Sequence, residues 1–192
     1  MRVPGLSLTC SPALVAAFLH MGAPVSADSC DHVMVQGQFL DDIVVCASSV
    51  LPPQGANTYR PANLSFLGPR DQAWCEGASG DGIGEYVSMR FRPSASFQTL
   101  IIENGYQKNQ STFVNNNRVR HATLRTDGGL EVRFELADTM GQQRLRLSHP
   151  VNTEWLTLTI DSVWPGARWR DTCISFIGPD LEEMNYQGIE MN

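Results

Sequence analysis

The chain of 192 residues is short of positive charge and has no run of lysine or arginine residues. Its 14 Lys and Arg residues are outnumbered by 20 Asp and Glu residues, which gives a net charge of −6 at pH 7. Nucleic acids and anionic membranes bind proteins mainly through clustered positive charge. The composition therefore argues against both as primary partners.

Motifs of catalysis and cofactor binding are also missing. There is no G-x-S-x-G nucleophile turn and no H-E-x-x-H zinc motif, and His32, His121 and His149 are isolated. No two cysteines have the C-x₂₋₄-C spacing of a zinc site. The repeat Gly80-x-Gly82-x-Gly84 leads into a strand, whereas a phosphate cradle leads into a helix. These absences disfavour a serine hydrolase, a zinc enzyme and a nucleotide-binding protein.

No window shows apolar residues spaced by 3.6 over the length of a helix. Short segments alternate instead, most clearly at 130–136, where Leu130, Val132 and Phe134 are separated by charged residues. Eight or so short strands with Gly, Pro and Asn turns between them predict an all-β sandwich. We expect strands at 43–50, 86–91, 97–103, 121–125, 130–136, 144–147, 156–161 and 169–177, and a long polar loop at 106–120.

Residues 1–27 are typical of a secretory signal peptide. Arg2 precedes an apolar region, and Val25-Ser26-Ala27 supplies the small residues of a cleavage site. The apolar region is short and contains Pro12, which disfavours a retained membrane span. We expect a secreted or periplasmic protein with no transmembrane segment after cleavage. We divide it into a signal peptide at 1–27, a lead-in at 28–42, a β-sandwich domain at 43–178 and a tail at 179–192.

Four cysteines follow the predicted cleavage site: Cys30, Cys46, Cys75 and Cys173. An even number of cysteines in an exported chain predicts disulfides rather than free thiols. Four cysteines allow three pairings, and all three remain open at this point.

The most distinctive stretch runs from Trp74 through a glycine-rich turn into the strand at 86–91. Its four glycines within eight residues predict positive φ angles or close backbone approach. The turn also carries three acids, Glu76, Asp81 and Glu85, which could serve a glycoside hydrolase, bind a cation or simply face water. No cofactor is expected beyond a structural calcium ion, and the candidate ligands for that ion are Asp71, Asp81 and Glu85.

Aromatic residues in loops give the strongest indication of binding. Exposed rings stack on the apolar faces of sugars, while Asn and Arg side chains donate hydrogen bonds to sugar hydroxyls. For Trp74 and Trp169 we expect packing in the core instead. The candidate ligand-binding residues are Tyr59, Tyr106, Lys108, Asn117, Arg118 and Trp164.

Seven short segments within 46–177 carry a family resemblance. They are 47–55, 59–64, 73–77, 80–85, 104–108, 117–120 and 163–166 with 171–175. In this order they resemble the discoidin-like (coagulation factor type C) module, in the bacterial variant associated with NAD glycohydrolase translocation and glycan binding. The resemblance implies a galactose-binding-like jelly-roll sandwich that binds carbohydrate or another surface ligand and is not itself an enzyme.

The chain departs from the family pattern at three places. Residues 63–69 replace an Asp-Gly turn that resembles a calcium-supporting site, Tyr86 replaces a Trp, and Phe176 replaces a Glu. Positions 75 and 173 resemble sites where relatives carry either small apolar residues or Cys. The resemblance therefore implies a Cys75–Cys173 disulfide, which leaves Cys30 to pair with Cys46.

Three hypotheses about function follow. The first is an exported, non-catalytic module that recognises carbohydrate or a cell-surface glycan through loops at one end of the sandwich. The second is a protein-interaction or structural module of an envelope or toxin-delivery assembly. The third is a hydrolase that uses Glu76, Asp81 or Glu85.

Overall fold

The computed structural model describes residues 28–37 and 40–184. The predicted signal peptide and most of the predicted tail lie outside these residues. In chain order the elements are β1 (Ser29–Met34), β2 (Asp42–Ala47), the 3₁₀-helix η1 (Pro61–Leu64), β3 (Trp74–Cys75), β4 (Tyr86–Asn104), α1 (Gln110–Asn115), β5 (Asn117–Thr126), β6 (Glu131–Glu135), β7 (Gln142–Trp164) and β8 (Thr172–Pro179).

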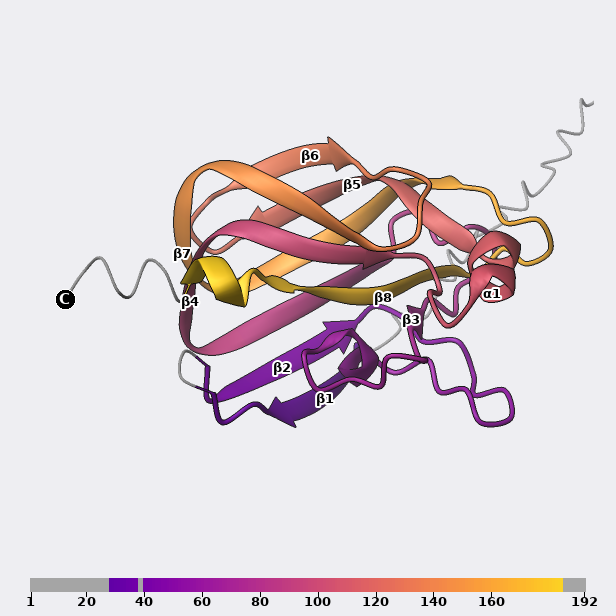
Figure 1. Cartoon of the computed structure of the whole chain (residues 1–192), viewed down its shortest axis with the longest axis horizontal. Coiled ribbons are helices and arrows are strands. Elements are labelled where there is room, and N and C mark those ends of the chain that lie inside the picture. Colours follow the sequence, from indigo (N-terminus) through magenta and orange to yellow (C-terminus); the bar gives the residue numbers. More distant parts are fainter. Residues whose placement is uncertain (1–27, 38–39, 185–192) are drawn as a thin grey trace, which may run out of the picture.

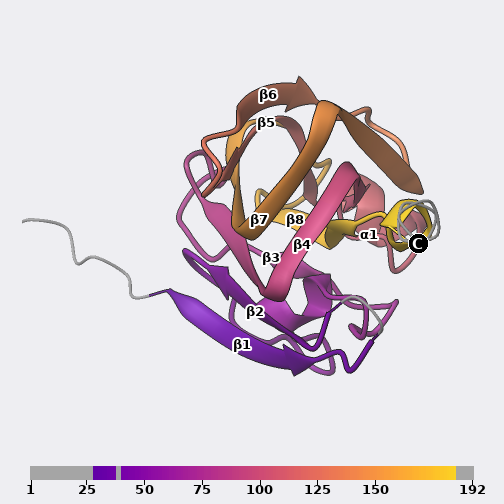
Figure 2. The same ribbon diagram turned by 90° about the vertical axis from the view of Figure 1, so that its left-hand side faces the viewer.

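The strands form a two-layered sandwich (Figures 1 and 2). In the layer that we call sheet 1, the order is β1, β2, the first half of β4, the second half of β7, β5 and β6. In sheet 2, the first half of β7 is followed by the second half of β4, β8 and β3. This architecture confirms the predicted all-β, galactose-binding-like jelly roll.

The two longest strands belong to both layers. The start of β4 pairs with β2, and its end pairs with β8 after a register shift between Arg90 and Ala95. The sequence predicted separate strands at 86–91 and 97–103 because Pro93 cannot donate a hydrogen bond to a ladder. The structure instead bends one strand there, as strands that switch sheets do at the corner of a sandwich. The predicted strands at 144–147 and 156–161 likewise both lie in β7.

The core lies between the sheets and follows the predicted alternation. Ile43, Val45 and Ala47 of β2 have no exposed surface, whereas the residues between them are partly exposed. Trp74 is also fully buried, and its Nε1 donates a hydrogen bond to the backbone oxygen of Ser49 at 2.9 Å. The prediction that Trp74 packs in the core is confirmed.

Both predicted disulfides are present. Cys30–Cys46 joins opposed residues of β1 and β2, and Cys75–Cys173 joins opposed residues of β3 and β8 across a sequence separation of 98. The segment expected as a lead-in thus contributes an edge strand. Beyond β8, residues 181–184 form one helical turn whose Met184 packs against the core.

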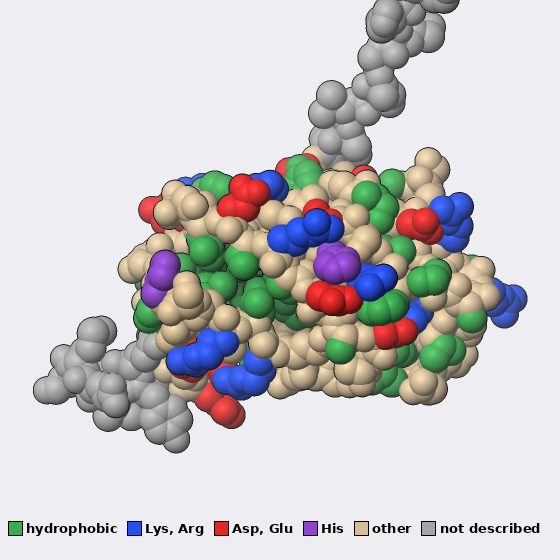
Figure 3. Space-filling model, turned by 90° about the horizontal axis from the view of Figure 1, so that it is seen from above, with side chains coloured by type: hydrophobic (Ala, Val, Ile, Leu, Met, Phe, Trp, Pro, Cys, Tyr) green, Lys and Arg blue, Asp and Glu red, His purple; other side chains and the backbone are tan. Residues whose placement is uncertain are grey.

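Apolar side chains gather in a hollow on the face that carries β5, β6 and β7 (Figure 3). On β6 and β7, the half-buried side chains of Val132, Phe134 and Leu145 pack against the core. Among the described strands, β6 pairs with β5 alone, so this edge of the core is thinly covered. Within the described ranges, no helix is long and apolar enough to cross a membrane.

Candidate functional site

The long loops meet at the end of the sandwich where α1 lies (Figure 1). They connect β2 to β4, β4 to β5, and β7 to β8, and side-chain hydrogen bonds tie the β6–β7 loop to them. All six predicted ligand-binding residues lie in or directly beside these loops. We call this region the loop end.

The glycine-rich turn of the loop end is shaped by close approach and positive φ. Gly82 has a φ of 68°, and a Cβ there would lie 2.5 Å from Cγ of Glu76. A Cβ on Gly77 would lie 2.4 Å from the backbone oxygen of Val50. Both positions therefore require glycine, as the sequence predicted.

Glu76 joins this turn to the last strand. Its fully buried carboxylate accepts hydrogen bonds from the backbone N–H groups of Thr172, at 3.0 Å, and Ala78, at 2.7 Å. Burial raises the pKa of Glu76, while the two N–H donors act in the opposite direction. The Glu76 carboxylate therefore has a structural role, because it binds the backbone N–H groups of both the turn and the last strand.

The three predicted calcium ligands are each held by a different group. Asp81 accepts two hydrogen bonds from Arg170, at 2.7 and 2.6 Å, which with a bond from Asn117 lower its pKa to about 2. Glu85 accepts from Ser48 and Ser49, and Asp71 lies 3.9 Å from Lys108 Nζ. Among the described residues, no three His, Cys, Asp or Glu side chains are grouped as a metal site would require. A calcium ion at these acids stays a prediction.

Three of the predicted contact residues tie the loops to one another. Arg118 is 6% exposed, and its guanidinium donates two hydrogen bonds to Asp138, both at 2.8 Å, and one to the backbone oxygen of Asn116 at 2.8 Å. Asn117 is buried, with bonds to Asp81 and to backbone groups of the β7–β8 loop. Trp164 donates to the backbone oxygen of Leu136 at 2.9 Å.

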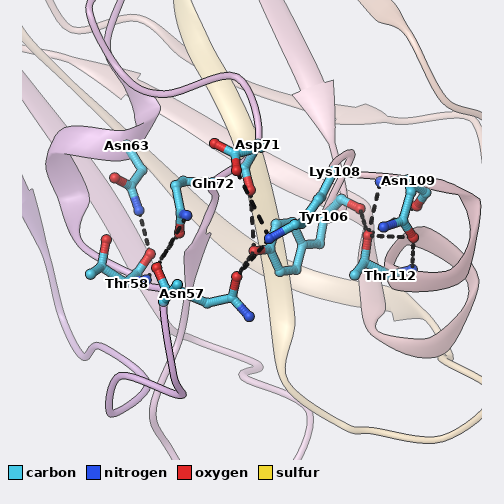
Figure 4. A network of polar contacts seen from close by, with 10 residues as sticks. Asn57, Thr58, Asn63, Asp71, Gln72, Tyr106, Lys108, Asn109 and Thr112 are labelled. Atoms are coloured by element: carbon cyan, nitrogen blue, oxygen red, sulfur yellow. Dashed lines mark hydrogen bonds and ion pairs between the residues drawn. The ribbon is translucent and has the colours of Figure 1, made fainter.

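The other three predicted residues, Tyr59, Tyr106 and Lys108, form a second cluster, and Figure 4 shows Tyr106 and Lys108 converging on Asn57. The rings of Tyr59 and Tyr106 meet edge to face, with centroids 6.1 Å apart. The Tyr106 hydroxyl and Lys108 Nζ both donate to Oδ1 of Asn57 at 3.0 Å. Burial raises the pKa of Tyr106 to about 12, so its hydroxyl remains a donor at physiological pH.

A small hollow of about 110 Å³ opens beside this cluster. We call it the loop-end hollow; it is lined by Leu51, Gln54, Asn57, Tyr59, Tyr106, Thr112, Asn116, Trp169 and Asp171. Its volume is below the roughly 300–1,000 Å³ of pockets that enclose a small molecule. It can therefore receive one edge or end of a larger ligand.

Trp169 lies on the outside of the loop end, so the prediction that it packs in the core is wrong. It is 41% exposed, and Arg168 stacks on its ring at 4.8 Å. The reason is the path of the β7–β8 loop, which the backbone oxygen of Asn115 fixes by accepting hydrogen bonds from the N–H groups of Arg168 and Trp169. No local sequence pattern indicates contacts across more than fifty residues.

Asp171 supplies a free acceptor in the hollow. Its pKa is raised by burial, and among the described residues no side chain donates a hydrogen bond to its carboxylate. The sequence reasoning did not select Asp171, Trp169 or Asn57 as binding residues. The one available signal was that Trp169 and Asp171 flank Arg170 in the polar loop between Pro165-Gly166 and the last strand.

The sequence matches the NAD glycohydrolase translocation F5/8 type C domain over residues 39–178. No curated protein matches the chain in sequence.

Solved structures with the same fold include carbohydrate-binding modules of family 32. The module of C. perfringens NanJ, solved in complex with galactose, is 14% identical, covers 70% of this chain and 90% of its own, and has a TM-score of 0.53. A second module from Clostridium perfringens, in complex with GalNAc-β-1,3-galactose, is 11% identical with coverages of 70% and 92% and a TM-score of 0.51. The module of Streptococcus pneumoniae EndoD is 10% identical, with coverages of 71% and 94% and a TM-score of 0.53.

Identities this low establish a shared fold and no more, whereas the family match covers most of the chain. The family is one of binding modules without a catalytic centre of their own. The chain belongs to the NAD glycohydrolase translocation F5/8 type C domain family.

Proposed function

We propose that this protein is an exported, non-catalytic module that binds carbohydrate at the loop-end hollow. The observation that carries the proposal is the pairing, in one hollow, of an exposed ring, Trp169, with the carboxylate of Asp171, to which no side chain of the described residues donates. Family 32 modules of the same fold have been solved with galactose and with GalNAc-β-1,3-galactose, which supports sugar as the ligand class.

The chemistry of the hollow suits the end of a glycan chain. A pyranose ring presents an apolar face that stacks on an aromatic ring, and its hydroxyls donate hydrogen bonds. A hydrogen bond from a sugar hydroxyl to an ionised carboxylate is about twice as strong as one between two neutral groups. Asn57 also lines the hollow, and its Oδ1 is held by the Tyr106 hydroxyl and Lys108 Nζ, which fixes the orientation of its amide.

The predicted contact residues then divide into two roles. Tyr59 and Tyr106 form the wall of the hollow, and Lys108 orients Asn57. Asn117, Arg118 and Trp164 hold the surrounding loops in place through hydrogen bonds to backbone oxygens. Nearly all of the ligand contact therefore falls to residues that reach the surface of the hollow.

Two disulfides suggest a location outside the cytoplasm, because such bonds persist in oxidising compartments. We place the protein in the periplasm or the extracellular medium, after cleavage of residues 1–27. We also place the domain boundary close to the family match at 39–178, with β1 attached to it through Cys30–Cys46.

A glycan array followed by titration calorimetry with galactose and GalNAc-β-1,3-galactose tests the proposal. We expect Trp169→Ala and Asp171→Asn each to weaken binding about ten-fold or more, because each removes an interaction worth roughly 1.4 kcal/mol. Leu67→Ala provides a matched control, since Leu67 is 60% exposed but does not line the hollow.

Full binding by both variants would refute the assignment of the site. A stoichiometric protein partner with no binding across a broad array would instead favour an interaction module. Glycan cleavage that is lost when Glu76, Asp81 and Glu85 are all replaced would favour the hydrolase alternative.

A further inference from the structure

A second and larger concavity lies on the outer face of sheet 1. It has a volume of about 910 Å³ and crosses β2, β4 and β7. We call it the sheet-face groove; it is lined by Asp28, Val44, Cys46, Tyr86, Ser88, Met89, Arg90, Arg92, Asp127, Glu154, Trp155 and Thr157. It shares no lining residue with the loop-end hollow.

The strand register arranges the floor of the groove in two rows. Val44, Arg90 and Trp155 are direct neighbours on adjacent strands, and Cys46, Ser88 and Thr157 form the next row. Three strands spaced by about 4.8 Å give the floor of the groove a length of about 10 Å across the sheet. Because its floor is a hydrogen-bonded sheet pinned by Cys30–Cys46, this shape exists before any ligand binds.

Trp155 presents an uncovered aromatic face in this groove. Its side chain is 40% exposed. It lies at an outward-facing position of β7, directly before buried Leu156. Arginines stack on Trp164 and Trp169, but none does so on Trp155 within the described residues. A rigid strand thus holds a large ring ready for stacking.

Unengaged hydroxyls lie next to this ring. Thr157 follows Trp155 on the same face of β7, and Ser88 lies opposite Thr157 on β4. Among the described residues, neither hydroxyl has a hydrogen-bond partner within the protein. They can donate to, and accept from, the hydroxyls of a ligand.

The charges of the groove fit an uncharged ligand. Its two arginines are already compensated: Arg90 lies 3.6 Å from Glu154, and Arg92 lies 4.0 Å from Asp42. Asp127 adds further negative charge to the lining. A phosphate or uronate chain would meet this excess of acids, which disfavours anionic ligands.

The backbone of the groove disfavours an extended peptide. Peptides that add to a sheet use the free hydrogen-bonding edge of a strand. Here β2, β4 and β7 are each paired on both sides along the groove. Recognition must therefore come from side chains that stack and hydrogen-bond, as for a sugar chain.

We propose that the sheet-face groove is a second carbohydrate-binding site, which takes a short segment from within an uncharged polysaccharide. Trp155 stacks on one sugar ring, and Ser88, Thr157 and the outer nitrogens of Arg90 bond its hydroxyls. The proposal does not depend on the loop-end hollow. The hollow, at about 110 Å³, suits the end of a glycan, whereas the groove, at about 910 Å³, has room for a longer segment.

Affinity electrophoresis of the mature protein tests the groove. The probes are native gels containing galactan, galactomannan, xyloglucan or dextran, with polygalacturonate as the anionic comparison. We expect at least one neutral polysaccharide to retard the wild type, and Trp155→Ala to lower the association constant by about ten-fold, the upper range for loss of a stacked ring. Trp155→Phe should retain most of the retardation, and Trp169→Ala should retain it fully.

Oxidative footprinting by mass spectrometry locates the contact directly. The polysaccharide that retards the protein should protect Trp155 several-fold more than Trp169. No retardation in any neutral gel, stronger retardation by polygalacturonate, or unchanged retardation of Trp155→Ala would each overturn the groove proposal. Because the loop-end proposal is tested with galactose and a disaccharide, either proposal can fail without the other.

Discussion

The loop-end hollow and the sheet-face groove are built in opposite ways. The hollow is small and collects side chains from Leu51 to Asp171, which are held by hydrogen bonds between loops. The groove is about eight times larger, and its floor comes from regular strands whose outward positions alternate with the core. One region needs the correct placement of several loops, and the other needs only a correctly paired sheet.

The two exposed tryptophans illustrate the difference. Trp155 precedes buried Leu156 in an alternating strand, so its outward position follows from local periodicity. Trp169 lies in a loop whose path depends on the backbone oxygen of Asn115. Loss of distant contacts should therefore damage the hollow more than the groove.

The largest expected effect comes from comparing the two disulfides. The chain-entropy model assigns about 4–5 kcal/mol to a loop near 100 residues and about 3 kcal/mol to one near 15 residues. Cys75 and Cys173 are separated by 98 residues, and Cys30 and Cys46 by 16. Replacing Cys75 and Cys173 by Ala should therefore lower the free energy of unfolding by more than replacing Cys30 and Cys46 by Ala.

Urea denaturation of the two double variants measures this difference. Galactose binding should fall only in the first variant, because Asp171 lies two residues from Cys173. Equal losses of stability, or loss of galactose binding in the second variant alone, would contradict the comparison.

Arg118→Ala should give the next largest effect, a loss of about 3 kcal/mol in the free energy of unfolding. The change removes a buried cation that bonds Asp138 and leaves the backbone oxygens of Asn116 and Pro165 without a donor. Thermal and urea denaturation measure it, with Arg125→Ala as an exposed ion-pair control that should change stability far less. Weakened sugar binding at unchanged stability would show that Arg118 contacts ligand instead.

The Asp81–Arg170 pair should make the loop end sensitive to strong acid. The pKa of Asp81 falls from an ordinary value of 3.8 to about 2 in the folded protein. Its contribution to stability is therefore present above pH 4 and is lost as the pH falls towards 2. The difference in unfolding free energy between wild type and Asp81→Asn should shrink over this range; a constant difference would argue against the ion pair.

The smallest effect should appear in the pH dependence of galactose binding. Because burial raises the pKa of Asp171, its carboxylate is protonated at a higher pH than an ordinary aspartate. Mild acid should weaken binding several-fold in the wild type but leave the weak binding of Asp171→Asn unchanged. Retardation by neutral polysaccharides should not change over the same range, since stacking on Trp155 involves no titrating group.

Much of the fold could be predicted because it depends on local chemistry. Period-two alternation indicated most of the strands, and Gly82 is required by a positive φ that the glycine density predicted. Strand continuity was the exception. Pro93 ends a ladder locally, but only the second sheet shows that the same strand continues.

The candidate site could be predicted only in outline. The search for aromatic residues in loops selected Tyr59 and Tyr106, and both line the hollow. The same search for loop residues also selected Arg118, which is buried. A polar residue beside a turn has the same sequence signature whether it faces solvent or bonds another loop.

By itself, the sequence determined the all-β class, the alternating core and the number of cysteines available for disulfides, since each depends on residue type and near-neighbour spacing. Only the tertiary structure decided which loops meet, that Trp169 is exposed while Arg118 is buried, and that no side chain of the described residues donates to Asp171. These outcomes depend on contacts between residues tens of positions apart, such as Arg118 with Asp138 and Asn115 with Trp169. The spacing of residues along the chain does not indicate such contacts, because they form only when the two sheets pack together.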